Sequence, residues 1–250
     1  MNFSELFGNA QWVTCDSGCT SPVIKGGFFI EEPKKAEITI CGLGFFRLWI
    51  NGREVSKDKF VPVNSQYCKR DLTAFEYPIL DELSYRTYAV RYDISKFIVD
   101  GKNDIRVILG CGWFAQQKRS AEGFAKYGDI KLCYKIDVEN KSGKKYTFVS
   151  DESLEWKQSR ITENNIYFGE VHDMSLADEL TANSGFQNVI KAPAHETQFF
   201  VQDCPADRVE RVIKPAKLFD LGEVSIYDMG ENISGYPVVA ATVDGANITV

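Results

Sequence analysis

The sequence predicts an all-β protein, in which an antiparallel β-sandwich is followed by the start of a second β-sandwich. Apolar and polar residues alternate over several short stretches, which is typical of strands with one buried face. Turn-forming pairs such as Asn51-Gly52 and Asp100-Gly101 separate these stretches at short intervals, as in sandwiches and barrels. Long amphipathic helical patterns are scarce, which argues against helical and α/β folds.

The first strong element is a hairpin in the sequence LWINGREV, residues 48–55. Asn-Gly favours a two-residue type I′ turn, because both central residues of that turn need a positive φ. On the strand before the turn, Leu48 and Ile50 face one side and Trp49 faces the other. We expect one face to fill the core between two sheets. The other face is expected to be solvated or docked against a part of the protein that this sequence lacks.

Three further strands follow from period-two patterns. The clearest is Asp129–Val138, in which Lys131, Lys135 and Asp137 are expected to face water. The apolar residues expected on its buried face are Ile130, Leu132, Tyr134, Ile136 and Val138. The stretches 86–92 and 103–109 show the same alternation. Only brief helical turns are expected, at 93–99, 115–124 and 175–180.

The organisation of the chain changes near residue 180. We expect a first β-sandwich at residues 1–182, and a linker with an incomplete second β-sandwich at 183–250. Prolines interrupt the segment up to residue 217, and strand patterns then resume at 217–230, 236–243 and 246–250. The 33 residues from Leu218 to Val250 are few for a closed sandwich. We therefore expect the sequence to stop before the natural end of this domain.

The net charge, the apolar runs and the N-terminus predict which partners and which location the protein has. The net charge of −6 and the pI near 5.1 argue against binding to a nucleic-acid backbone. No apolar run reaches the roughly 18 residues that a membrane helix needs, so no membrane partner is expected. The N-terminus lacks the basic and apolar regions of a signal peptide, which predicts a cytoplasmic protein. The oligomeric state stays open.

The common metal, nucleotide and catalytic motifs are weak. The seven cysteines have irregular spacings without CxxC, and the two histidines are His172 and His195, so we expect reduced thiols rather than structural zinc. The segment GCGWFA at 110–115 matches a loose dinucleotide pattern, but the surrounding βαβ alternation is missing. No GxSxG motif is present, and adjacent acids such as Glu31-Glu32 are expected to be solvated. No catalytic residue is therefore predicted.

Aromatic residues beside amides and carboxylates form the candidate site. Sugars are bound by aromatic faces, while amides and carboxylates hydrogen-bond their hydroxyl groups. The candidate substrate-binding residues are Trp113, Phe114, Asn164, Asn165, Tyr167, Glu170 and Asp173. The alternative is structural: Trp113 and Tyr167 pack as anchors, and Glu170 and Asp173 pin a turn.

Four segments, in the same order, resemble the N-terminal β-sandwich region of bacterial α-L-rhamnosidases of glycoside hydrolase family 78. They are AEITICGLGFFRLWINGREV at 36–55, TYAVRYDISKFIVDGKNDIRVILGCGWF at 87–114, IYFGEVHDMS at 166–175 and YDMGENISGY at 227–236. Three positions depart from the family pattern. Cys111 replaces a polar residue, Ser175 replaces an arginine, and Tyr236 replaces a tryptophan.

The resemblance implies a jelly-roll sandwich of the galactose-binding type and a non-catalytic role. In this family, terminal α-L-rhamnosyl residues are hydrolysed with inversion by glutamates of a helical barrel that this sequence does not contain. The implied partners are rhamnosides, through the parent enzyme, and that enzyme's C-terminal catalytic domain. No cofactor is expected, with one open alternative: a calcium ion near Asn164, Asn165 and Glu170, although calcium needs six to eight oxygen ligands. Two other functions stay open, a stand-alone carbohydrate-binding module and an accessory domain of a β-galactosidase-like glycosidase.

Overall fold

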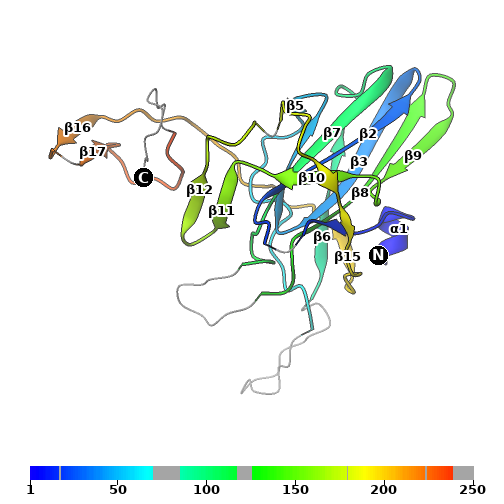
Figure 1. Cartoon of the computed structure of the whole chain (residues 1–250), viewed down its shortest axis with the longest axis horizontal. Coiled ribbons are helices and arrows are strands. Elements are labelled where there is room, and N and C mark those ends of the chain that lie inside the picture. Colours follow the sequence, from blue (N-terminus) through cyan, green and yellow to red (C-terminus); the bar gives the residue numbers. More distant parts are fainter. Residues whose placement is uncertain (17, 70–84, 117–125, 179, 223, 239–250) are drawn as a thin grey trace. The chain divides into compact units, whose positions relative to one another are not determined.

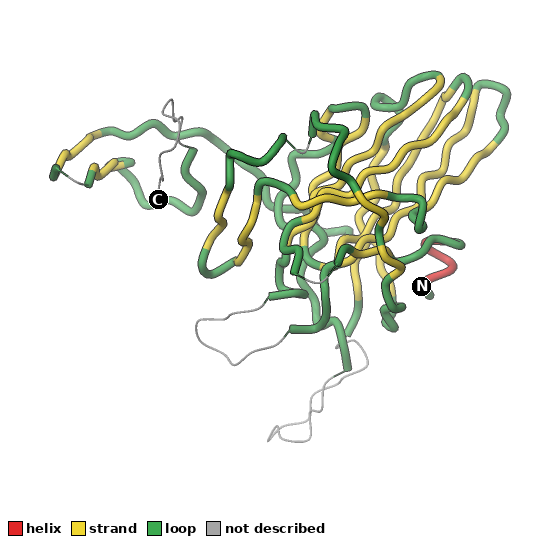
Figure 2. The backbone as a smooth tube through the Cα atoms, in the orientation of Figure 1, coloured by secondary structure: helices red, strands yellow, loops and turns green. Residues whose placement is uncertain are grey.

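The computed structural model describes the chain except for residues 17, 70–84, 117–125, 179, 223 and 239–250. Two compact units divide between Asp207 and Arg208. The first unit is built around two β-sheets (Figure 1), and the second contains one β-hairpin. Figure 2 shows strands and loops throughout the described residues, with one short helix at the N-terminus. The predicted all-β class is confirmed.

The larger sheet has seven strands, in the order β14-β1-β8-β3-β6-β15 with β9 paired to β8. Its strands are β1 (Val13–Thr14), β3 (Pro33–Leu43), β6 (Thr87–Asp93), β8 (Lys131–Asn140), β9 (Lys145–Val149), β14 (Ile190–Lys191) and β15 (Phe199–Val201). Every pair is antiparallel except β6 with β15, which is parallel. The predicted strands at 86–92 and 129–138 correspond to β6 and β8.

The second sheet has six strands, in the order β13-β10-β2-β7-β4-β5. They are β2 (Pro22–Ile30), β4 (Phe45–Ile50), β5 (Arg53–Glu54), β7 (Gly101–Gly110), β10 (Glu155–Gln158) and β13 (Gln187–Asn188). Two separate hairpins are formed by β11 (Ile161–Asn165) with β12 (Gly169–His172), and by β16 (Lys217–Asp220) with β17 (Ser225–Asp228). The predicted strand at 103–109 lies within β7.

The predicted Asn51-Gly52 hairpin is confirmed between β4 and β5. Both turn residues have positive φ, +50° at Asn51 and +72° at Gly52. Leu48 and Ile50 lie in the main core, whereas Trp49 belongs to a second apolar cluster on the opposite face of the sheet. That second cluster also contains Val23 and Ile108, and the half-buried residues packed against it are Ile161, Leu180 and Phe186. The outer face around Trp49 is therefore covered by a later segment of the same chain.

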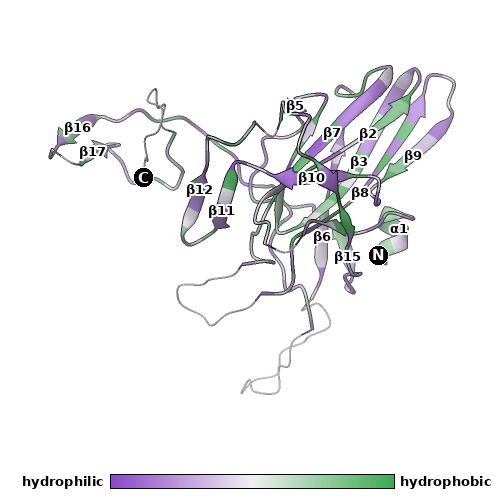
Figure 3. Ribbon diagram, in the orientation of Figure 1, coloured by the Kyte–Doolittle hydropathy of each residue, from purple (hydrophilic) through white to green (hydrophobic). Residues whose placement is uncertain are grey.

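Strand β8 shows how the sequence pattern builds the core. The five apolar residues predicted to face inward are all buried, with exposed fractions of 4% or less. Figure 3 shows hydrophobic and hydrophilic residues mixed along the strands of the sandwich, as expected for sheets with one apolar face.

The prediction that Lys131 faces water is wrong. Its exposed fraction is 8%, and its Nζ donates to the carbonyl of Pro193 at 3.0 Å. The ammonium also lies 5.8 Å from the ring centroid of Trp12. Strand β1 pairs with this end of β8, and β14 pairs with β1 in turn. Trp12 and Pro193 lie next to these two strands, so the lysine charge is directed to an aromatic face and a carbonyl.

Helical structure is limited to α1 (Phe3–Phe7) among the described residues, and none of their helices is long and apolar enough to cross a membrane. The sequence analysis did not predict α1, although Asn2 and Glu5 form a capping box at its start. The expected helical segment at 93–99 is instead one hydrogen-bonded turn, with Phe97 N donating to the carbonyl of Ile94 at 2.9 Å. In the segment at 175–180, Leu176 N likewise donates to the carbonyl of Asp173 at 3.3 Å, and residue 179 lies outside the described residues. Most of 115–124 lies outside the described residues.

The segment after residue 182 contributes three edge strands to the sandwich. Strands β13 and β14 pair with β10 and β1, and β15 pairs with β6. The expected irregular linker is thus partly integrated into the first compact unit. The domain division at 182 and 183 stays a prediction.

The second compact unit, Arg208–Val250, contains the β16–β17 hairpin. Leu218 pairs with Tyr227 and Phe219 pairs with Ile226, and all four side chains are exposed. Strand patterns predicted beyond residue 238 lie outside the described residues. The described part of this unit is a hairpin whose apolar side chains are largely unburied.

Candidate functional site

The β11–β12 hairpin carries most of the candidate residues and is anchored to the end of β7. Asn164 Oδ1 accepts a hydrogen bond from the backbone N–H of Cys111 at 2.9 Å. A Cβ at Gly110 would lie only 3.2 Å from the same oxygen, so the absence of a side chain there permits the close approach. Figure 1 shows this hairpin standing beside the two main sheets. Asn164 therefore fixes the hairpin to the sandwich.

A chain of polar contacts runs from Asn164 along β12. Asn164 Nδ2 donates to Glu170 Oε1 at 2.7 Å, and Glu170 Oε2 lies 2.9 Å from His172 Nε2. Glu170 and His172 share one face of β12, because residues two apart on a strand point to the same side. Their side chains are 44% and 48% exposed. The sequence analysis missed His172 as a member of this group, although its spacing from Glu170 was the available signal.

An aromatic pair lies at the same end of the hairpin as Asn164 and Glu170. The ring centroids of Trp113 and Tyr167 are 5.7 Å apart, with an interplanar angle of 88°. Trp113 is half-buried against the main core, and Tyr167 is 45% exposed. Asn165 closes the hairpin turn, because its Oδ1 accepts from the backbone N–H groups of Tyr167 and Phe168 at 2.8 and 3.2 Å. The hairpin tip thus presents a ring next to amide and carboxylate groups.

Phe114 lies elsewhere, in the core. It is 1% exposed, and its ring packs edge-on against Tyr67 and His195 at centroid distances of 5.1 and 5.5 Å. The chain turns sharply after β7, where Ala115 N donates to the carbonyl of Cys111 at 3.0 Å. The structure therefore gives Trp113 and Phe114, adjacent in sequence, different surroundings.

Asp173 lies at the opposite end of the hairpin from the turn. Its backbone N–H donates to the carbonyl of Arg160 at 2.8 Å. Its Oδ1 accepts from the backbone N–H and the hydroxyl of Ser175 at 2.9 and 2.6 Å. These two hydrogen bonds hold the pKa of the Asp173 carboxyl below its usual value. This geometry matches the structural alternative, in which Asp173 pins a turn.

Four of the seven candidate residues are therefore brought close to the hairpin tip. Phe114 lies in the core, and Asp173 lies at the opposite end of the hairpin. The four are Trp113, Asn164, Tyr167 and Glu170, with Asn165 shaping the turn. An aromatic ring beside an amide and a carboxylate has the chemistry to contact a polyhydroxylated ligand. Within the described part of the chain, no group of three or more His, Cys, Asp or Glu side chains has the arrangement to hold a metal ion.

The chain matches one family model, described as the alpha-L-rhamnosidase N-terminal domain, over residues 31–214. A curated alpha-L-rhamnosidase from Formosa agariphila is 29% identical over 219 residues, which cover 82% of this chain and 21% of that protein. A second alpha-L-rhamnosidase from the same organism is 25% identical and is matched over 22% of its length. The chain thus spans about a fifth of the length of these curated relatives.

Solved structures show the same architecture. An alpha-L-rhamnosidase from Dictyoglumus thermophilum aligns with a TM-score of 0.74 and 27% identity, over 93% of this chain and 26% of that chain. An alpha-L-rhamnosidase from Aspergillus terreus aligns with a TM-score of 0.79 and 21% identity, over 93% of this chain and 27% of that chain, and supports the fold. The family model covers well over half of the chain, from β3 through β15. The chain belongs to the alpha-L-rhamnosidase N-terminal domain family.

Proposed function

We propose that this chain is the non-catalytic N-terminal sandwich of an enzyme that hydrolyses terminal α-L-rhamnosyl residues. One observation carries the proposal: a curated alpha-L-rhamnosidase is matched over 82% of this chain but over only 21% of its own length. Most of such an enzyme lies outside the matched region, and we assign the bond-breaking chemistry to that remainder. The sandwich would then brace the catalytic part.

Three carboxyl groups of the described residues support this division of labour. An inverting glycosidase needs one carboxylic acid with a raised pKa and a second carboxylate roughly 6.5–9.5 Å away. The pKa values of Asp93, Asp173 and Asp178 are all lowered, mainly by hydrogen bonds from nearby backbone and serine groups. The buried polar side chains in the described part of the chain are Ser, Thr, Asn, Gln, Lys and Arg. We therefore assign Asp93, Asp173 and Asp178 to the stabilisation of turns rather than to proton donation.

The test is hydrolysis of 4-nitrophenyl α-L-rhamnopyranoside by the purified 250-residue chain. We expect no release of nitrophenol above the blank. A full-length alpha-L-rhamnosidase such as the Formosa agariphila relative serves as the positive control. Cleavage by this chain alone, abolished by heat denaturation, would contradict the non-catalytic assignment.

A second candidate function is direct sugar binding at the β11–β12 hairpin. The perpendicular Trp113–Tyr167 pair beside the Asn164–Glu170 contact favours it. Aromatic faces pack against sugar C–H groups, and the neighbouring amide and carboxylate suit hydroxyl groups. We propose L-rhamnose or a rhamnoside as the ligand.

Titration calorimetry with L-rhamnose, with and without added calcium, tests this second function. Binding heat that is lost in Tyr167→Ala but kept in Phe29→Ala would support the hairpin site, because Phe29 is a similarly exposed ring on β2. Binding heat that appears only when calcium is present would support a calcium ion bound near Asn164, Asn165 and Glu170. An absence of heat in the unmodified chain would leave the scaffold role alone.

A further inference from the structure

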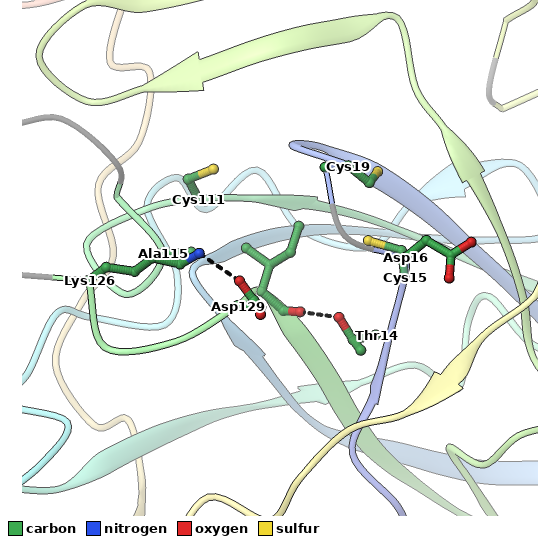
Figure 4. Close-up of a pocket in the computed structure, with 10 residues that line it drawn as sticks. Thr14, Cys15, Asp16, Cys19, Cys111, Ala115, Lys126 and Asp129 are labelled. Atoms are coloured by element: carbon green, nitrogen blue, oxygen red, sulfur yellow. Dashed lines mark hydrogen bonds and ion pairs between the residues drawn. The ribbon is translucent and has the colours of Figure 1, made fainter.

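Three of the seven cysteines gather around one pocket of the first unit, away from the hairpin tip. The pocket has a volume of about 100 Å³ and lies between the loop after β1, the end of β7 and the residues before β8. Its lining includes Thr14, Cys15, Cys19, Cys111, Lys126 and Asp129 (Figure 4). A cavity needs roughly 10–15 Å³ to hold one water molecule, so this pocket has room for a small hydroperoxide.

Cys15 and Cys19 line the same side of this pocket. Figure 4 shows their two sulfur atoms near one another. Cys19 N donates to the carbonyl of Asp16 at 3.4 Å. The Cys19 thiol also lies 3.0 Å from Gln158 Oε1. Because the two sulfur atoms lie near one another, a bond between them requires only a short approach of the two side chains.

The surroundings make the two thiols unequal. The hydrogen bond from Cys19 lowers the pKa of the Cys15 thiol, with further help from its own backbone and from Thr14. The same contact, together with burial, raises the pKa of Cys19. Since the thiolate is the reactive form, Cys15 is the better nucleophile of the pair.

Cys111 is the third thiol of the cluster, but it is less suited to react. Burial raises the pKa of Cys111, and its Sγ donates to the carbonyl of Thr20 at 3.6 Å. Figure 4 shows Cys111 across the pocket from Cys15 and Cys19, whose sulfur atoms lie near one another. Cys19 is therefore the natural partner for an oxidised Cys15.

We propose that Cys15 and Cys19 form a dithiol pair that a small hydroperoxide oxidises to an intramolecular disulfide. The Cys15 thiolate attacks one peroxide oxygen, the O–O bond breaks, and a sulfenic acid forms with release of hydroxide, which takes up a proton. The Cys19 sulfur then attacks the Cys15 sulfur; the S–S bond forms, the S–O bond breaks, and the leaving hydroxide takes the Cys19 proton. Two thiols and one hydrogen peroxide thus give one disulfide and two waters. This inference does not depend on the proposed function.

Tryptic mapping of the whole chain tests the pairing. Both cysteines fall in the tryptic peptide 1–25, whereas Cys111 falls in 107–118 and Cys68 in 60–69. The reduced chain is treated with stoichiometric hydrogen peroxide, alkylated and digested. We expect peptide 1–25 to lose two hydrogen atoms in mass and both alkylation sites before peptide 60–69 changes, and dithiothreitol to reverse the change.

Variants separate the roles of the two thiols. In Cys19→Ser, we expect Cys15 to accumulate as a sulfenic acid that dimedone traps; in Cys15→Ser, peptide 1–25 should stay reduced. Cys68→Ser is the matched control, because that thiol is exposed and outside the cluster, and it should leave oxidation of peptide 1–25 unchanged. A cross-link between peptides 1–25 and 107–118 would overturn the pairing. The proposal would be overturned if both thiols of peptide 1–25 stayed reduced while Cys68 was oxidised. This outcome is measured on the unmodified chain, so it does not depend on the folding of any variant.

Discussion

The side-chain amide of Asn51, at the tip of the β4–β5 hairpin, donates to the side-chain oxygen of Asn103 at 2.8 Å. Asn103 is 3% exposed, and its oxygen also accepts from the backbone N–H of Val99 at 2.9 Å. Its Nδ2 donates to the carbonyls of Val99 and Gly101 at 2.9 and 3.1 Å. Asn103 thus joins the β4–β5 turn to the turn that precedes β7, at one end of the six-stranded sheet.

Asn103→Ala should therefore destabilise the sandwich. The substitution leaves partly buried backbone groups of Val99 and Gly101 and the Asn51 amide without their partner, which costs about 3 kcal/mol at roughly 1–3 kcal/mol per unsatisfied group. Urea unfolding followed by circular dichroism measures the loss. The exposed Asn188 on β13 provides the control, and Asn188→Ala should change the unfolding free energy by less than about 0.5 kcal/mol. Equal effects of the two substitutions would contradict this role for Asn103.

Gly44→Ala should be more damaging than a glycine substitution in an open turn. Gly44 has a φ of +116°, and a Cβ there would lie 2.0 Å from the carbonyl oxygen of Gly110. The clash adds to the backbone strain, so we expect a loss above about 3 kcal/mol or failure to fold. Gly143 has a similar φ of +83° but no heavy atom within 4 Å of the added Cβ. Gly143→Ala should cost only about 1–2 kcal/mol, and thermal unfolding of the two variants separates strain from clash.

Acid should destabilise the first unit through His195. Burial, followed by the charge of Lys131, lowers the pKa of His195 to about 4 from the ordinary 6.5. Below about pH 6.5 the unfolded chain binds a proton at this histidine, whereas the folded chain does not. The free energy of unfolding is therefore largest above pH 6.5 and falls as the pH decreases towards 4. Between pH 6.5 and pH 5 the loss is about 2 kcal/mol, at about 1.4 kcal/mol per pH unit.

The comparison uses His195→Phe, which keeps an aromatic ring beside Trp12 and Phe114. Its unfolding free energy should fall by about 2 kcal/mol less than that of the unmodified chain between pH 6.5 and pH 5. His172→Gln, at an exposed histidine, is the control and should keep the full acid sensitivity. Identical pH profiles for the unmodified chain and His195→Phe would exclude His195 as the source.

Arg106 should hold the segment around residues 180–186 against the outer face of the six-stranded sheet. Its guanidinium donates to the carbonyl of Ala182 at 2.9 Å and to Asn183 Oδ1 at 2.7 Å, and it pairs with Asp104 at 3.1 Å. The side chain is only 7% exposed. Arg106→Met should release this segment and cost about 2–3 kcal/mol, because hydrogen bonds from a charged group are lost in a buried setting.

Hydrogen exchange checks this prediction. Peptides that cover residues 180–190 should exchange faster in Arg106→Met than in the unmodified chain. Arg91 pairs with Glu37 on the surface, with both side chains 43% exposed, so Arg91→Met should change stability by less than about 1 kcal/mol. Unchanged exchange in the 180–190 region would show that apolar packing alone holds the segment.

The sequence by itself determined the features that depend on local pattern. Alternation along residues 129–138 predicted five apolar residues that face the core, and Asn51-Gly52 predicted the hairpin turn. Both predictions were possible because side-chain direction and φ preference are properties of neighbouring residues. The order of the four motif segments also predicted the family. In the candidate site, the sequence selected the stretch that carries Asn164, Tyr167 and Glu170.

Tertiary structure alone decided which surfaces are covered and which distant groups meet. Trp113 and Phe114 are neighbours in sequence, yet one lies beside Tyr167 and the other lies inside the core, because the chain turns after β7. The burial of Lys131 and the contact between Cys111 and Asn164 likewise depend on strands and loops far along the chain. Such contacts are fixed by the packing of both sheets together, which no local pattern of residues encodes.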